Sequence, residues 1–177
     1  MNGKFKPGLG LTDMKKNEWI YDMVNGSLIG DALMLPKEDL IVTSEFKEGM
    51  YCYQQYEKVF HAKLRIEELL LSDEDEDTEL IINNMNDIIR YLSMNVYDNA
   101  KSGAPKGKLS RAFDNDPYCR EKYMEILAAK ANLELRLATG SQPDVEIMID
   151  GMDNIMKHVV LKMYEYGKMA AKRNRAG

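Results

Sequence analysis

Histidine, cysteine and tryptophan are scarce in this chain: its 177 residues include two histidines, two cysteines and one tryptophan. The chain has no Cys-x-x-Cys pair, no His-Glu-x-x-His sequence and no Gly-rich phosphate loop. These motifs are the usual sequence signs of zinc sites and nucleotide-binding loops. His61 and His158 occupy unrelated places in the repeat described below. We therefore expect a protein that is not an enzyme, with no catalytic residues, no bound metal ion and no other cofactor.

Long apolar runs are also missing. No stretch approaches the about 20 apolar residues of a membrane-spanning helix, and no charged-then-apolar signal peptide opens the chain. A chain of this length buries enough apolar surface to fold without disulfides. The sequence therefore predicts a cytoplasmic protein with reduced thiols and no contact with membranes.

The chain does contain an internal repeat. Residues 46–97 align without a gap on residues 113–164, at an offset of 67 positions, and 14 of the 52 aligned pairs are identical. Unrelated segments of this composition would share about 3 or 4. The two cysteines, Cys52 and Cys119, form one of the identical pairs. We interpret the pattern as a tandem duplication.

Each copy has the pattern of two amphipathic helices joined by a short turn. In the second copy, Asp116-Pro117 is an N-cap followed by proline at the first helical position, which is a strong start signal. The equivalent start in the first copy is Gly49-Met50, and its second helix should run from about Asp77 to Asp98. The sequence thus predicts an all-α bundle of two similar helical hairpins, with an N-terminal helix packed on them. We divide the chain into an N-terminal helical segment (1–45), a first hairpin (46–100), a basic linker (101–112) and a second hairpin with a basic tail (113–177).

Charge is unevenly distributed along the chain. Residues 1–16, 101–111 and 168–177 carry +3, +4 and +4, whereas the whole chain carries −5. Because the three basic segments sum to +11, the remaining residues hold −16. The predicted helical body is therefore acidic, which argues against a general nucleic-acid-binding platform.

Two polar features are candidate partner-binding sites. The first is an acidic run between the helices of the first copy, and the second is a lysine–glutamate pair that both copies carry at i,i+4 spacing. The run comprises Asp73, Glu74, Asp75, Glu76 and Asp77, and the pairs are Lys63–Glu67 and Lys130–Glu134. A structural role is also open for both, because acidic residues suit a helix N-terminus and a lysine in an apolar seam can extend its ammonium to water.

Composition favours an interaction protein. Thirteen methionines and ten tyrosines supply adaptable, amphipathic surface. We hypothesise stoichiometric binding to a protein or nucleoprotein partner through the acidic body, since a negative surface attracts basic grooves such as those that hold nucleic acid in a nuclease. A phage or mobile-element inhibitor of a host nucleic-acid-targeting nuclease, of the anti-CRISPR kind, fits this description. A homodimer is a further possibility.

Two other functions stay open. A nucleic-acid accessory protein would use the cations of the linker and tail, which are Lys106, Lys108, Arg111, Lys172, Arg173 and Arg175. An all-α nucleotide pyrophosphohydrolase would bind Mg²⁺ through carboxylates on facing helices. Its candidates here are Glu67, Glu68, Glu79 and Asp87, although they lack the expected Glu-x-x-Glu and Glu-x-x-Asp spacing.

Overall fold

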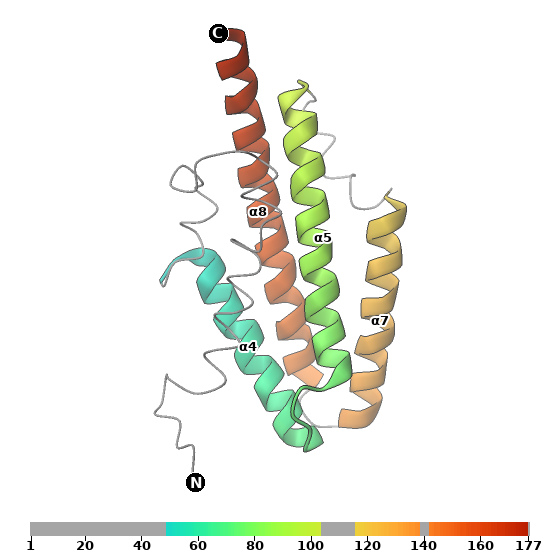
Figure 1. Cartoon of the computed structure of the whole chain (residues 1–177). Helices are drawn as coiled ribbons and strands as arrows, with labels where there is room; N and C mark the ends of the chain where they lie inside the picture. The colour runs from blue at the N-terminus through green and yellow to red at the C-terminus, as the bar shows by residue number, and fades with distance from the viewer. Residues whose placement is uncertain (1–48, 104–115, 139–141, 177) are drawn as a thin grey trace.

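The described part of the molecule is helical. The computed structural model describes residues 49–103, 116–138 and 142–176, and within them there is no β-strand. Its helices are α4 (Tyr51–Leu70), α5 (Glu76–Lys101), α7 (Pro117–Leu137) and α8 (Gln142–Ala176) (Figure 1). None of these helices is long and apolar enough to cross a membrane. The prediction of an all-α bundle is therefore confirmed.

Several predictions fall outside the described residues. They are the N-terminal helical segment (1–45) and most of the basic linker, with Lys106, Lys108 and Arg111. Lys101, which we had assigned to the linker, is instead the last residue of α5.

Local signals explain where the helices begin. Asp116 caps α7 by accepting a hydrogen bond from the Cys119 N–H at 3.0 Å, and Pro117 fills the first helical position. Asp75 caps α5 by accepting from the N–H groups of Asp77 and Thr78. Three of the five residues of the acidic run, Asp75, Glu76 and Asp77, therefore belong to the cap and first turn of α5.

The last helix includes the basic segment at the end of the chain, because α8 continues to Ala176. The basic tail is thus a helical projection that extends beyond the end of α5 (Figure 1). Good helix formers such as alanine, lysine and arginine in this stretch account for its continuation.

The helices pack across the two copies. α5 and α8 run parallel through the centre, α4 lies against α8, and α7 lies against α5 (Figure 1). The first helix of each copy therefore packs mainly on the second helix of the other copy. Direct contact between the two helices of one hairpin is much smaller.

Equivalent positions are buried in both copies. Pairs that are fully buried in both copies include Cys52/Cys119, Val59/Ile126 and Ile66/Leu133 in the first helices, and Ile81/Met148 and Ile88/Ile155 in the second helices. Both cysteines are free thiols, and burial raises the pKa of the Cys119 thiol to about 12. Matched burial is what a duplicated hairpin produces, while the duplication itself stays a prediction from the sequence.

Two glycines of α8 allow neighbouring helices to approach closely. A Cβ on Gly151 would lie 2.5 Å from a methyl carbon of Val59 in α4. A Cβ on Gly167 would lie 2.5 Å from the carbonyl oxygen of Tyr97 and 2.7 Å from the Cβ of Ala100, both in α5. Gly151 thus lets α8 approach a side chain of α4, and Gly167 lets α8 approach backbone atoms of α5.

We predict that Gly167→Ala lowers the free energy of unfolding by about 1–3 kcal/mol, because the tight contact involves backbone that cannot rotate away. Gly151→Ala should cost less, since the Val59 side chain can adjust. Urea unfolding of both variants tests this. If both alanines instead raise stability by the about 1 kcal/mol of helix propensity alone, the close packing of α5 on α8 is wrong.

Candidate functional site

The lysine–glutamate pair of the first copy is part of a three-residue ionic cluster. Lys63 Nζ lies 2.5 Å from Glu67 Oε1 in the same helix and 2.9 Å from Glu79 Oε1 in α5. Lys63 is only 2% exposed. Its ammonium therefore does not extend to water, and it links α4 to α5 inside the protein.

The second copy repeats the cluster in a more solvated form. Lys130 Nζ lies 2.5 Å from Glu146 Oε1 in α8 and 3.8 Å from Glu134 Oε1. The Lys130 side chain is 27% exposed. In both copies the lysine therefore joins the two helices of its own hairpin, which make little direct contact otherwise.

Glu67 also fixes the acidic turn that follows α4. Its Oε1 accepts hydrogen bonds from the Asp75 N–H at 2.9 Å and the Thr78 hydroxyl at 3.0 Å, in addition to Lys63. The Thr78 hydroxyl is also 2.9 Å from the Asp75 carbonyl oxygen. One buried carboxylate thus orders the start of α5 through three donors.

Arg136 of α7 holds the same turn from the other copy. Its guanidinium donates to both carboxylate oxygens of Asp75, at 2.6 and 2.8 Å, and to Asp77 at 2.7 Å. The hydrogen-bonded Arg136 lowers the pKa of Asp75 below its usual 3.8, and the capped Thr78 and Asp77 N–H groups act in the same direction. The carboxylates of Asp75 and Asp77 are therefore engaged in contacts within the protein.

An equivalent ion pair forms at the start of α8. Arg65 of α4 donates to Asp144 Oδ1 at 2.8 Å, and Asp144 is the repeat equivalent of Asp77. Each of these aspartates is thus paired with an arginine from the first helix of the other copy. The two arginines differ by one helical turn in their own copies, so the repeat alignment does not reveal their common role.

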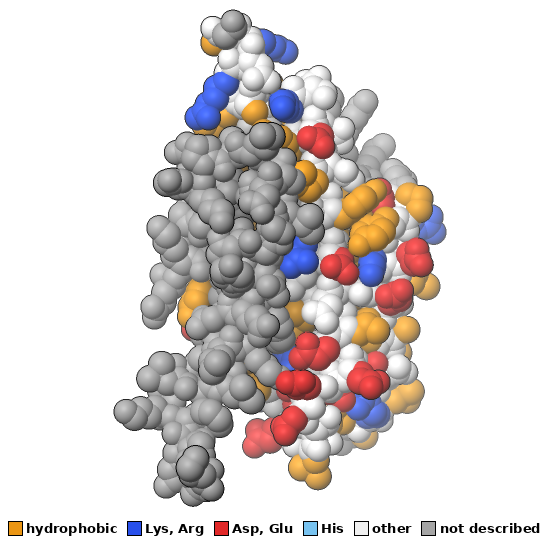
Figure 2. Space-filling view, viewed as in Figure 1, with side chains coloured by type: hydrophobic (Ala, Val, Ile, Leu, Met, Phe, Trp, Pro, Cys, Tyr) orange, Lys and Arg blue, Asp and Glu red, His pale blue; other side chains and the backbone are white. Residues whose placement is uncertain are grey.

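The rest of the acidic run faces solvent. Asp73, Glu74 and Glu76 are exposed, and Glu74 has a left-handed backbone with φ 57°. Large aliphatic side chains are exposed at the same end of the bundle: Leu69 (55%), Leu71 (94%) and Leu135 (80%). We call these six residues the acidic end; Figure 2 shows red side chains gathered at the corresponding end of the molecule. Exposed aliphatic groups and carboxylates at the same end of the bundle form a surface suited to a basic partner.

The opposite end is basic. The last three turns of α8 carry Lys168, Lys172, Arg173 and Arg175 and no carboxylate. Figure 2 shows blue side chains at the projecting tip. The cations proposed for nucleic-acid binding in this segment are therefore placed on a helix, far from the acidic end.

Other candidate residues have structural neighbours. Asp87 lies 3.4 Å from Lys122, and Glu67 and Glu79 share Lys63. Across residues 49–103, 116–138 and 142–176, no three His, Cys, Asp or Glu side chains are arranged to hold a metal ion.

The two histidines also differ in surroundings. His158 stacks near Tyr51 of α4, with ring centroids 4.8 Å apart. At equivalent repeat positions, Tyr91 and Tyr118 have centroids 4.6 Å apart. His158 thus takes the place of a tyrosine in a repeated aromatic contact between helices. His61 is exposed on α4.

Sequence reasoning found the lysine–glutamate pairs but missed their third members. Glu79 and Glu146 are identical at equivalent positions, and this signal could have placed them beside the lysines. Arg65 and Arg136 are not at equivalent positions of the repeat, so the alignment did not indicate their role.

Comparison with known proteins gives no further guide to function: no family model, curated protein or solved structure matches this chain.

We predict that Lys63→Met lowers the free energy of unfolding by about 3 kcal/mol or more, because it leaves the Glu67 charge buried without its cation. Lys130→Met is the matched control, and its partly exposed cluster should cost about 1 kcal/mol or less. Urea unfolding at pH 7 measures both. The double variant Lys63→Met/Glu67→Gln should recover part of the loss; equal costs for the two single variants would contradict the buried cluster.

We also predict a pH-dependent effect of Arg136→Met. The depressed pKa of Asp75 contributes stability that is present above about pH 4 and is lost as pH falls through the folded-state pKa. The stability difference between wild type and Arg136→Met should therefore be largest near neutral pH and shrink below pH 4. Unfolding curves from pH 3 to 7 test this. Arg120→Met, which removes an exposed arginine of the same helix, should show no such trend.

Proposed function

We propose that this protein binds a basic partner protein stoichiometrically through its acidic end, and that it acts by occupying that partner's surface. The observation that carries the proposal is the combination of fixed backbone and exposed side chains at this end. Glu67 and Arg136 order the turn, while Asp73, Glu76 and Leu71 point away from these internal contacts into solvent.

The turn at the acidic end is ordered before a partner binds, which favours binding. Holding the turn in one conformation before binding reduces the conformational entropy lost in the complex. Exposed Leu69, Leu71 and Leu135 supply apolar area, and the neighbouring carboxylates supply attraction to cations. Such an interface would have an apolar centre with a charged rim.

The chemistry of the partner follows from the charges. A positively charged groove, of the kind that holds nucleic acid in a nuclease, offers lysines and arginines to the carboxylates. Inhibition of a host nucleic-acid-targeting nuclease, as by an anti-CRISPR protein of a phage or mobile element, is the biological setting that we propose. Binding would not need a catalytic residue.

The alternative functions rest on other residues. A nucleic-acid accessory role would draw on Lys172, Arg173 and Arg175, and it finds support in the helical basic tip of α8. A pyrophosphohydrolase would need its carboxylates free for Mg²⁺, whereas Glu67 and Glu79 here surround an ammonium. We therefore favour protein binding by the acidic end.

We predict that Asp73→Lys/Glu76→Lys weakens partner binding at least tenfold. Both positions are exposed, so the change leaves the Arg136 contacts in place. The tagged full chain is used to capture its partner from nuclease-treated host lysate, and the affinity of the purified complex is measured between 50 and 500 mM salt. Affinity should fall as salt rises, because exposed charges are screened.

Asp98→Lys/Glu121→Lys is the matched control, because it makes the same charge change at exposed positions of the opposite end. It should leave the affinity within about twofold of wild type. Equal weakening by both double variants, or capture that disappears when nucleic acid is digested, would contradict the proposal. Circular dichroism checks the fold of each variant, since Glu76 also favours the N-terminus of α5 by up to about 1 kcal/mol.

A further inference from the structure

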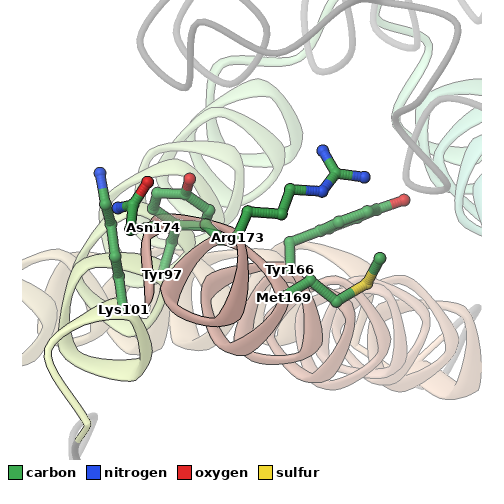
Figure 3. A pocket seen from close by; sticks show the side chains of 7 residues that line it. Tyr97, Lys101, Tyr166, Met169, Arg173 and Asn174 are labelled. Carbon is green, nitrogen blue, oxygen red and sulfur yellow. The ribbon is translucent and has the colours of Figure 1, made fainter. Parts of the chain in front are cut away.

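A hollow of about 200 Å³ lies between the C-terminal turns of α5 and α8. Its lining residues are Tyr97, Lys101, Tyr166, Met169, Ala170, Arg173 and Asn174 (Figure 3). Tyr97 and Tyr166 are each at least nine-tenths buried, so their rings form fixed walls. The hollow is thus apolar and aromatic, with polar groups at its edge.

Two cations of this hollow are available to a ligand. The side chains of Lys101 and Arg173 form no hydrogen bond or ion pair with the residues that the structure describes, and no carboxylate lines the hollow. α5 and α8 both end here, and each helix C-terminus carries about half a negative charge. The five cations from Lys101 and residues 168–176 exceed that charge together with the charge of Asp98, which is exposed in the last turn of α5, so the site attracts anions.

We propose that this hollow binds a nucleoside phosphate, either as a free nucleotide or as part of a single strand. The base packs on the exposed Met169 and against the exposed edges of Tyr97 and Tyr166, while Lys101 and Arg173 hold the phosphate. Apolar and aromatic side chains accept the flat surface of any base, and arginine forms paired hydrogen bonds to phosphate oxygens. Asn174 supplies an amide that both donates to and accepts from a base edge.

The size of the hollow sets the extent of the ligand. About 200 Å³ is below the about 300–1,000 Å³ of sites that enclose drug-sized molecules, so it accommodates one base. This site is separate from the acidic end, which lies at the other end of the bundle (Figure 1). Its ligand therefore does not depend on the function proposed above.

The tip of α8 provides an internal control. Tyr166, Met169, Ala170 and Arg173 follow one another at i, i+3, i+4 and i+7, which places them on one helix face. Lys172 and Arg175 are outside the lining. A built site needs Arg173 in particular, whereas general attraction by a basic tip would use Arg173 and Arg175 equally.

The test measures binding of thymidine 5′-monophosphate and of a fluorescent pentathymidylate to the full chain at 150 mM salt. R173A should weaken binding of at least one probe tenfold or more, and R175A, an identical change two residues away, less than twofold. Tyr166→Ala should weaken binding of the same probe, because it removes part of the aromatic lining of the hollow. Circular dichroism confirms that each variant stays folded.

The probes also separate the sources of the ligand. Binding of the monophosphate that depends on Arg173 supports a free nucleotide, and binding of pentathymidylate alone that depends on Arg173 supports a single strand. Equal losses in R173A and R175A, or no binding of either probe at 1 mM, would overturn the proposal. Inorganic phosphate that competes as well as the monophosphate would overturn the role of the base.

Discussion

The parallel packing of α5 and α8 is the constraint on which the rest of the structure depends. Two parallel helices place both positive N-termini at one end of the molecule and both negative C-termini at the other (Figure 1). Carboxylates gather at the first end, including Asp75, Asp77 and Asp144, and cations gather at the second. The parallel direction of the two helices is therefore a structural reason for the acidic and basic ends, independent of any function.

The same packing explains why each hairpin needs polar links. Because α4 lies on α8 and α7 lies on α5, the helices of one hairpin share little apolar contact. Lys63 and Lys130 bridge that separation through Glu79 and Glu146. Arg65 and Arg136 complete the arrangement. Each lies in the first helix of one copy and forms an ion pair at the start of the second helix of the other copy.

The two repeat segments differ in detail around this common frame. The first copy buries its lysine and orders a turn through Glu67, whereas the lysine of the second copy is partly exposed. Glu67, Asp75 and Arg136 hold the turn, so Asp73 and Glu76 beside it are free to meet a partner. At the other end, the positive charge of Lys101 and Arg173 is greater than the partial negative charge of the two helix C-termini. This excess of positive charge is the basis of the proposed nucleotide site.

The sequence by itself determined the all-α class, the helical seams and the positions of the repeated core residues, since hydrophobic periodicity and caps are local signals. It also marked Lys63–Glu67 and Lys130–Glu134 as repeated polar features. Only the tertiary structure decided which helices are neighbours, because side chains alike in two copies can pack within a copy or between copies. It also decided which members of the Asp73–Asp77 run contact Arg136 and which face solvent. Tyr97 and Arg173, from two different helices, line one hollow. These outcomes depend on distances between residues far apart in the chain, which periodicity does not encode.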